Sequence, residues 1–275
     1  MDDPIWNALA REASIAAQHL GEGATLLGKA NYAHHAYYGQ AFFSLSTGIE
    51  RAAKLALVVS YALENEGSFP NPKQLRSYGH DLGSLLAAVD EIAIKFDLPP
   101  SCRLPNSPIS NNIIHVLTQF ASNVTRYYNL DFLMNDVHEK AESDPVKSWY
   151  ELVTKLVLSK HLTEKKRLMI EEHANFASAM MEHFSIVSHT SECGKHMSTV
   201  YETSIQTGLT EFAKPFTRMY VLQFGRFFRK TMDRLTDEKY RKRMEFIPHL
   251  AEFFDTFNCD DSYFKSRKIW SIYKP

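Results

Sequence analysis

Apolar residues recur every three or four positions along most of the chain, which is the spacing that one face of an α-helix requires. This pattern predicts a first helix over residues 4–20, because Asp3 followed by Pro4 is a typical helix start. Gly21 and the glycines that follow it predict a looser connection after that helix.

Three more helices are predicted before residue 136. The first covers residues 37–64 and carries a long apolar stripe, and the second covers residues 80–96. Four of the eleven prolines then lie between residues 99 and 108, which predicts a surface loop. Ser107 and Pro108 open the last of these helices, which reaches about residue 134.

A charged, weakly apolar stretch at residues 137–143 indicates a boundary between a helical domain, residues 1–136, and a C-terminal helical region, residues 137–275. Helical pattern fills most of the second region. Interruptions are predicted near residues 159–163, 191–194, 215 and 235–236. The aromatic tail, residues 263–273, reads as a short extended segment. No longer alternating pattern occurs, so the predicted fold is all-α.

Composition narrows the class of protein. The chain has 275 residues with 31 basic and 32 acidic side chains, so it is not a polycation and any contact with nucleic acid depends on a local patch. The acidic start and the short apolar runs predict a cytoplasmic protein without a membrane partner. The three scattered cysteines and the irregular spacing of the twelve histidines predict no disulfide, metal or cofactor.

Positive charge is concentrated in one segment. Residues 214–243 carry ten basic and three acidic residues. On a helical wheel the aromatic residues of this segment form one wall, which we interpret mainly as core, and basic residues form the other. We expect the basic wall to face water and to bind either phosphate backbone or an acidic partner. Its candidate nucleic-acid-binding residues are Arg218, Arg226, Arg229 and Lys230.

Polar residues interrupt the apolar helices of the first region at three places. Glu50 and Lys54 are four residues apart, the order of a surface helix ion pair. His80 precedes the third helix, where a cap is an equally good interpretation. The fourth helix carries the third group, in which Arg126 and Asn129 share a face. Asp131 follows them in the same helix. A network that ties helices together explains the third group equally well.

Taken in order, these segments resemble the HEPN superfamily, the higher eukaryotes and prokaryotes nucleotide-binding domains. The resemblance rests on Tyr38 to Lys54, on Gly79-His80-Asp81-Leu82 and on Arg126-Tyr-Tyr-Asn-Leu-Asp131, and it covers residues 36–136. It implies an up-and-down helical bundle that dimerises through its fourth helix. It also implies one of two functions, a metal-independent ribonuclease of toxin–antitoxin or antiphage systems or a non-catalytic interaction module.

The family's ribonuclease motif is an Arg followed after four to six residues by a His. By resemblance Arg126 steadies the scissile phosphate, whereas the motif's His is replaced here by Asp131. An aspartate is a weak general base at neutral pH and repels phosphate. His80 is the candidate for the missing imidazole, with Glu50 and Lys54 completing the cleft.

Two functions follow from these residues. The first is an RNA-acting protein of defence type, with Arg126, Asn129 and Asp131 at its site. The second is a catalytically silent module that binds RNA or a protein partner such as an antitoxin. Whether the protein is an enzyme stays open between them, and both imply a homo-oligomer.

Overall fold

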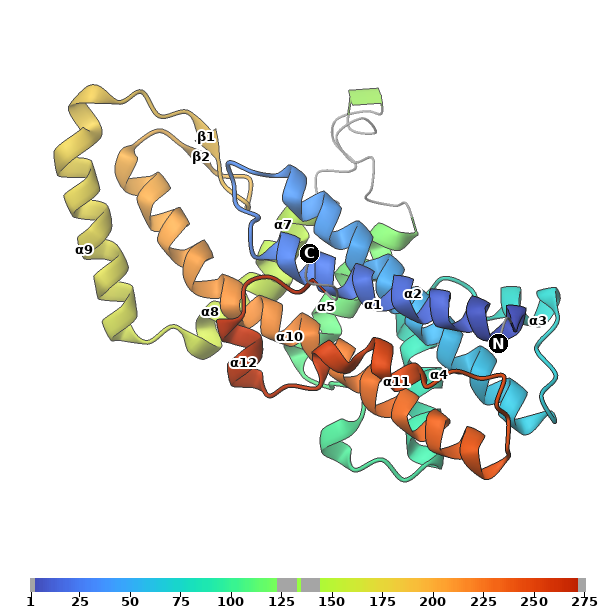
Figure 1. Ribbon diagram of the computed structural model, residues 1–275. Helices are drawn as coiled ribbons and strands as arrows, with labels where there is room; N and C mark the ends of the chain where they lie inside the picture. Colours follow the sequence, from blue (N-terminus) through green and yellow to red (C-terminus); the bar gives the residue numbers. More distant parts are fainter. Residues whose placement is uncertain (1–2, 123–132, 135–143, 272–275) are drawn as a thin grey trace.

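The computed structural model describes residues 3–122, 133–134 and 144–271. Its described part is all-α, as predicted, apart from a two-stranded antiparallel hairpin that pairs His189 with Met197 (Figure 1). The longer elements are α1 Pro4–Leu27, α2 Ala36–Glu64, α4 Leu82–Lys95, α5 Pro108–Ala121, α9 Glu164–Met181 and α10 Val200–Arg241. The shorter elements are α3 Pro72–Ser77, η1 Pro100–Cys102, α7 Pro145–Trp149, η2 Tyr150–Thr154, α8 Lys155–His161, η3 Glu182–Phe184, β1 His189–Thr190, β2 His196–Met197, α11 Leu250–Phe253, η4 Asp255–Phe257 and α12 Asp261–Ser266.

Helix α1 continues seven residues beyond its predicted end at residue 20, so the expected loose connection is wrong. Its glycines lie inside the helix, at positions where other segments of the chain pack against it. A Cβ atom on Gly23 would lie 2.6 Å from the Leu45 side chain of α2. On the α2 side, a Cβ atom on Gly48 would lie 2.9 Å from the backbone nitrogen of Leu20. The two backbones approach closely because neither position carries a side chain.

Helices α2 and α4 confirm the helices predicted over residues 37–64 and 80–96, to within two residues at each end. Helix α5 begins at Pro108 as predicted, but it ends at Ala121 with Ser122 as its C-cap, short of the predicted end near residue 134. Glu50 of α2 contacts His80 just before α4, and Glu64 at the end of α2 contacts Lys95 at the end of α4. The two helices therefore run in the same direction. Residues 65–81, which include α3, carry the chain back along the molecule between them.

Helix α10 is a single helix of 42 residues. The interruptions predicted at Pro215 and at Leu235-Thr236 are therefore wrong, although those near residues 159–163 and 191–194 lie between separate elements as predicted. A proline inside a helix removes one hydrogen bond and disfavours continuation. Here residues on both sides of Pro215 are buried, and their packing holds the helix together.

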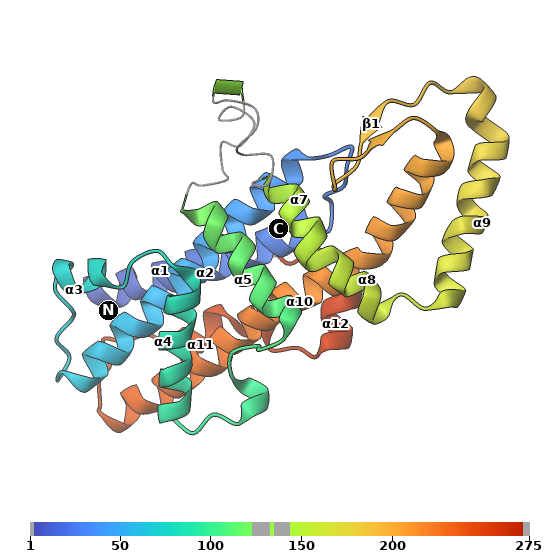
Figure 2. The same cartoon turned by 180° about the vertical axis from the view of Figure 1, so that it is seen from behind.

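The N-terminal part of α10 pairs with α9 to form an arm that projects from the body of the molecule (Figures 1 and 2). Between these helices the chain passes through the β1–β2 hairpin at the base of the arm. The rest of α10 packs against α1 and α2 on one side and against α11 and α12 on the other.

One hydrophobic core includes residues from both predicted regions. Phe42 of α2 contacts Phe120 of α5 and Trp149 of α7, with ring centroids 5.7 and 5.2 Å apart. Phe224 of α10 belongs to the same buried cluster. The described parts of the two regions therefore pack as one body, and the boundary proposed at residues 137–143 itself lies outside the described residues. None of the described helices is both long and apolar enough to span a membrane.

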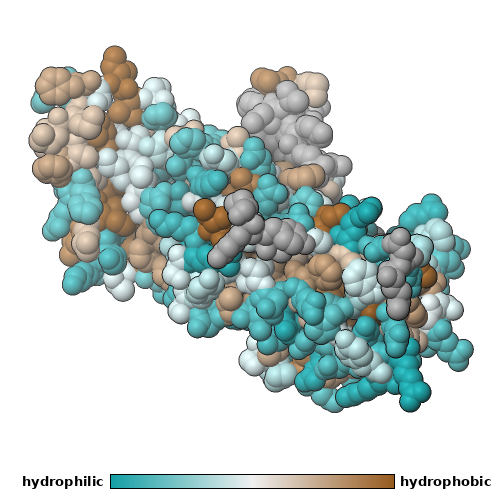
Figure 3. Space-filling view, in the orientation of Figure 1, coloured by the Kyte–Doolittle hydropathy of each residue, from teal (hydrophilic) through white to brown (hydrophobic). Residues whose placement is uncertain are grey.

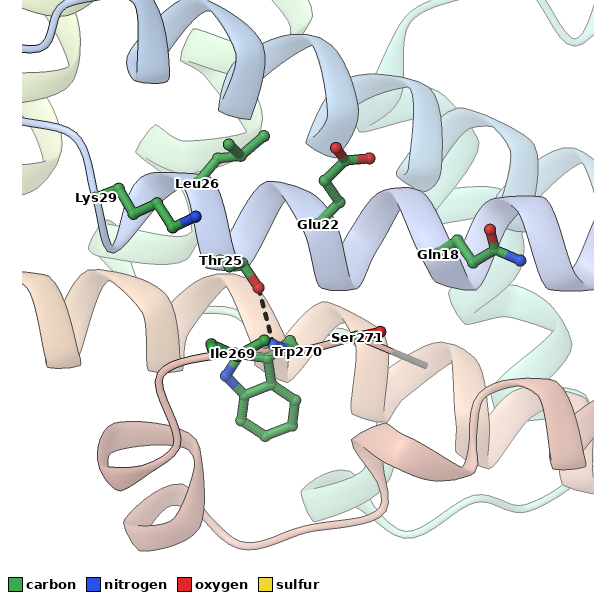
Figure 4. Close-up of a pocket in the computed structure, with 8 residues that line it drawn as sticks. All are labelled: Gln18, Glu22, Thr25, Leu26, Lys29, Ile269, Trp270 and Ser271. Atoms are coloured by element: carbon green, nitrogen blue, oxygen red, sulfur yellow. Dashed lines mark hydrogen bonds between the residues drawn. The ribbon is translucent and has the colours of Figure 1, made fainter. Parts of the chain in front are cut away.

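The C-terminal segment crosses α1 at Gly21. The tail is not extended throughout, because residues 261–266 form α12, and only the residues after it are extended. Trp270 is fully buried there, and its backbone N–H donates to the Thr25 hydroxyl at 2.8 Å (Figure 4). A Cβ atom on Gly21 would lie 2.1 Å from the Trp270 carbonyl oxygen.

We therefore predict that Gly21→Ala lowers the free energy of unfolding by about 1–3 kcal/mol, since the C-terminal segment must move to admit the methyl group. Gly39→Ala in α2 is the matched control, because no atom lies within 4 Å of its added Cβ. That control should raise stability by up to about 1 kcal/mol through helix propensity. Chemical denaturation measures both changes, and equal effects would contradict this account of Gly21.

Candidate functional site

The polar residues predicted on α2 and before α4 meet at one carboxylate. Glu50 Oε1 accepts a hydrogen bond from Lys54 Nζ at 2.8 Å and lies 2.9 Å from His80 Nδ1. The i, i+4 spacing on α2 brings Lys54 to Glu50. The return segment ends beside the same turn of α2 and delivers His80, whose side chain is 75% exposed.

The arrangement of His80 and Glu50 determines which ring nitrogen faces outward. An ionised carboxylate can accept a hydrogen bond but cannot donate one, so Nδ1 of His80 must carry the proton that it shares with Glu50. The other ring nitrogen, Nε2, is then the one that faces solvent. A carboxylate that fixes the tautomer of a histidine in this way prepares the other nitrogen to take up a proton. The group can therefore act as a general base on a substrate that reaches Nε2.

A separate groove lies further along α2 and α4, and none of Glu50, Lys54 and His80 lines it. Its volume is about 280 Å³, and its lining includes Leu57, Tyr61 and Glu64, which follow Lys54 on one face of α2. Tyr78 from the return segment closes one wall, and burial together with Tyr61 and Glu64 raises the pKa of its hydroxyl. The groove thus combines aromatic surface with charges of both signs.

Three predicted site residues, Arg126, Asn129 and Asp131, lie outside the described residues. Near its described end, α5 packs Phe120 on Phe42, with ring centroids 5.7 Å apart. Phe42 precedes Glu50 by eight residues, which corresponds to about 12 Å along an ideal helix. The structure thus brings together three of the six predicted catalytic residues, Glu50, Lys54 and His80.

The basic wall of α10 does not face water as expected. Arg218 is only 4% exposed, and its guanidinium donates to the carbonyl oxygens of Phe264 and Lys265 at the end of α12. Burial lowers the pKa of Arg218. The expectation was wrong because residues 244–271 wrap around the basic side of α10, which no helical wheel of α10 reveals. The aromatic wall is core as predicted, with Phe224 and Phe228 fully buried.

Two further arginines of this wall also hold the C-terminal segment. Arg226 forms an ion pair with Asp261 at 2.9 Å and donates to the Cys259 carbonyl oxygen at 3.1 Å. Arg229 pairs with Asp233 at 2.8 Å and lies 3.4 Å from Asp255. Lys230 is half-buried and has no ion pair among the described residues. Much of the local positive charge is therefore engaged inside the protein.

We predict that Arg229→Glu lowers the free energy of unfolding by more than about 1 kcal/mol, because it places a third carboxylate beside Asp233 and Asp255. Lys230→Glu on the next position should change it by no more than about 0.5 kcal/mol. Thermal unfolding of the two variants measures the difference. Equal stability would show that the ion pairs of Arg229 do not hold the C-terminal segment.

A buried carboxylate at the base of the arm was not predicted from the sequence. Glu192 lies in the turn of the β1–β2 hairpin and is 2% exposed. It accepts from Gln206 Nε2 at 2.6 Å, from the Thr210 hydroxyl at 3.1 Å and from the Tyr38 hydroxyl at 3.4 Å. Burial and the nearby Glu192 raise the pKa of Tyr38 well above its usual value. No spacing rule signals this group, since its partners come from α2 and α10.

We predict that Glu192→Ala destabilises the protein, since about 1–3 kcal/mol is lost for each buried donor left unpaired. Glu192→Gln should stay within about 1 kcal/mol of the natural protein, because a rotated Gln206 amide can present its oxygen to the new side chain. Denaturant titrations with hydrogen exchange across residues 189–197 compare the two. Equal losses would mean that the charge itself is required.

No group of three or more His, Cys, Asp or Glu side chains suited to a metal ion occurs in the described part of the chain. Comparison of the chain with protein-family models, with curated proteins and with solved structures finds no match.

Proposed function

We propose that this protein is an RNA-acting, HEPN-like protein of the toxin or antiphage-defence type, which cleaves RNA without a metal ion. In this proposal His80 Nε2 removes the proton from a 2′-hydroxyl. The 2′-oxygen then attacks the adjacent phosphorus and forms a 2′,3′-cyclic phosphate, while the bond from phosphorus to the 5′-oxygen breaks and the 5′-oxygen takes a proton from water. Arg126 steadies the phosphate by resemblance to the family motif, with Asn129 and Asp131 beside it.

The contact between His80 Nδ1 and Glu50 Oε1 at 2.9 Å is the observation that carries this proposal. The motif lacks its own histidine, so a catalytic role requires an imidazole from elsewhere in the same region. His80 is exposed and held in the required tautomer by Glu50. Lys54 adds a positive charge at the same place, which suits an anionic substrate.

A second candidate is a catalytically silent module that binds RNA or a protein partner. Glu50 Oε1 contacts both Lys54 and His80. A purely structural network of polar side chains on the surface has the same arrangement. The engagement of Arg218, Arg226 and Arg229 inside the protein favours a protein partner over RNA for this candidate.

RNA cleavage by purified protein tests the proposal. Arg126→Ala and His80→Ala should each abolish cleavage of a panel of RNAs, since a guanidinium on the transition-state phosphate and a general base each contribute a factor of about 10² or more. Chelator should have no effect. His35→Ala is the matched control, because that side chain is also exposed.

The outcomes separate the two candidates. Asp131→His should increase cleavage, because it restores an imidazole at the motif position. Natural protein with no cleavage above that of Arg126→Ala would reject catalysis and favour the silent module. Loss of cleavage in Arg126→Ala but not in His80→Ala would keep the reaction and remove His80 from it.

A further inference from the structure

Helix α9 leaves a row of apolar side chains exposed. Its inner face packs on α10, where Ala174 is fully buried and Ile170 meets Gly208. The outer face of the arm carries large apolar side chains (Figure 3). Phe176 is 70% exposed and Met180 is 61% exposed. Burying such side chains is worth about 1.5–3 kcal/mol each, so this face is suited to a partner.

The row has the spacing of a helix–helix seam. Met169, His173, Phe176 and Met180 are four, three and four residues apart, and all are exposed. At 100° per residue they lie within a strip 60° wide, which is the width of a seam that pairs with one other helix. The spacing is also symmetric, because it reads the same from either end of α9.

A symmetric seam is self-complementary when two copies run antiparallel. A two-fold axis between residues 174 and 175 places Met169 against Met180 of the partner subunit. The same axis places His173 against Phe176 of the partner subunit. Every seam residue then has a partner of suitable size, without any further element.

The charges of α9 favour the antiparallel direction. Lys165 and Lys166 lie in the first turn of the helix, where the helix dipole disfavours cations. Neither forms an ion pair among the described residues. An antiparallel copy brings the negative C-terminal end of its own α9 beside these lysines, whereas a parallel copy brings two more cations.

We propose that the arm is a self-association surface, through which α9 pairs antiparallel with α9 of a second copy of this chain. The nearly fully exposed Phe184, just beyond α9, extends the apolar surface at the arm's end. The partner's Phe184 then lies near the first turn of α9, where a lysine can approach its ring. The arm includes none of Glu50, Lys54 and His80, so this proposal does not depend on the proposed function.

Sedimentation equilibrium of the 275-residue chain tests whether this dimer forms. We expect the natural protein to dimerise and Phe176→Glu to raise the dissociation constant at least tenfold, because two carboxylates would lie at the centre of the seam. Ile94→Glu is the matched control, since Ile94 is 49% exposed on α4, away from the arm. Its dissociation constant should equal that of the natural protein. Circular dichroism checks that both variants fold.

A protein that stays monomeric up to high micromolar concentration would overturn the proposal. A dimer that Phe176→Glu does not weaken would also overturn the proposal, because such a dimer must form through a surface other than α9. The direction is tested by cysteine cross-linking. Met169→Cys combined with Met180→Cys should give covalent dimers, and Met169→Cys alone should not. The reverse result would show a parallel pair and contradict the antiparallel seam.

Discussion

The enclosure of α10 on both sides is the constraint on which the rest of the structure depends. Its aromatic wall joins the core that α1 and α2 build, and its basic wall is covered by the C-terminal segment. A guanidinium can be buried only when its donors are satisfied, and Arg218 meets two carbonyl oxygens at the end of α12. That requirement fixes where the C-terminal segment lies. Trp270 then reaches Thr25, and Gly21 must remain without a side chain. One long helix thus determines the path of the C-terminal segment.

Local signals in the sequence were sufficient for most helices. The N-caps Asp3 and Ser107 lie where the sequence predicts them, because a cap depends only on its own turn. The errors came from contacts between distant segments. The glycines after Leu20 indicate a helix end by local rules. In the structure Gly21 instead lets Trp270 approach α1 closely, and Gly23 does the same for Leu45. Pro215 reads as a break, yet its surroundings outweigh its local cost. Propensity describes the isolated segment, and packing decides the outcome.

The same difference between local signals and contacts of distant segments applies to the candidate site. Glu50 and Lys54 were predictable as a pair because a helix fixes their separation. Their meeting with His80 depends on the return of residues 65–81 along α2, which the spacing within one helix cannot show. The sequence carries no signal for the group around Glu192 either. Its partners lie 14, 18 and 154 residues away, and a glutamate in a turn of a polar hairpin has the sequence signature of an exposed residue. The same holds for Arg226 and Arg229, which read as solvent-facing from their wheel positions.

Glu192 also determines how the arm is held. It joins the hairpin to Tyr38 of α2 and to Gln206 and Thr210 of α10, at the point where the arm leaves the body. Helix α10 continues from the arm into the core without a loop, so no flexible joint separates the two. The outer face of α9 is therefore presented at a fixed orientation. A fixed face loses little conformational entropy when it binds, which lowers the cost of association for a seam of only four side chains. The buried Glu192 carboxylate at the base of the arm therefore supports the proposed seam, because it fixes the orientation in which α9 meets a partner.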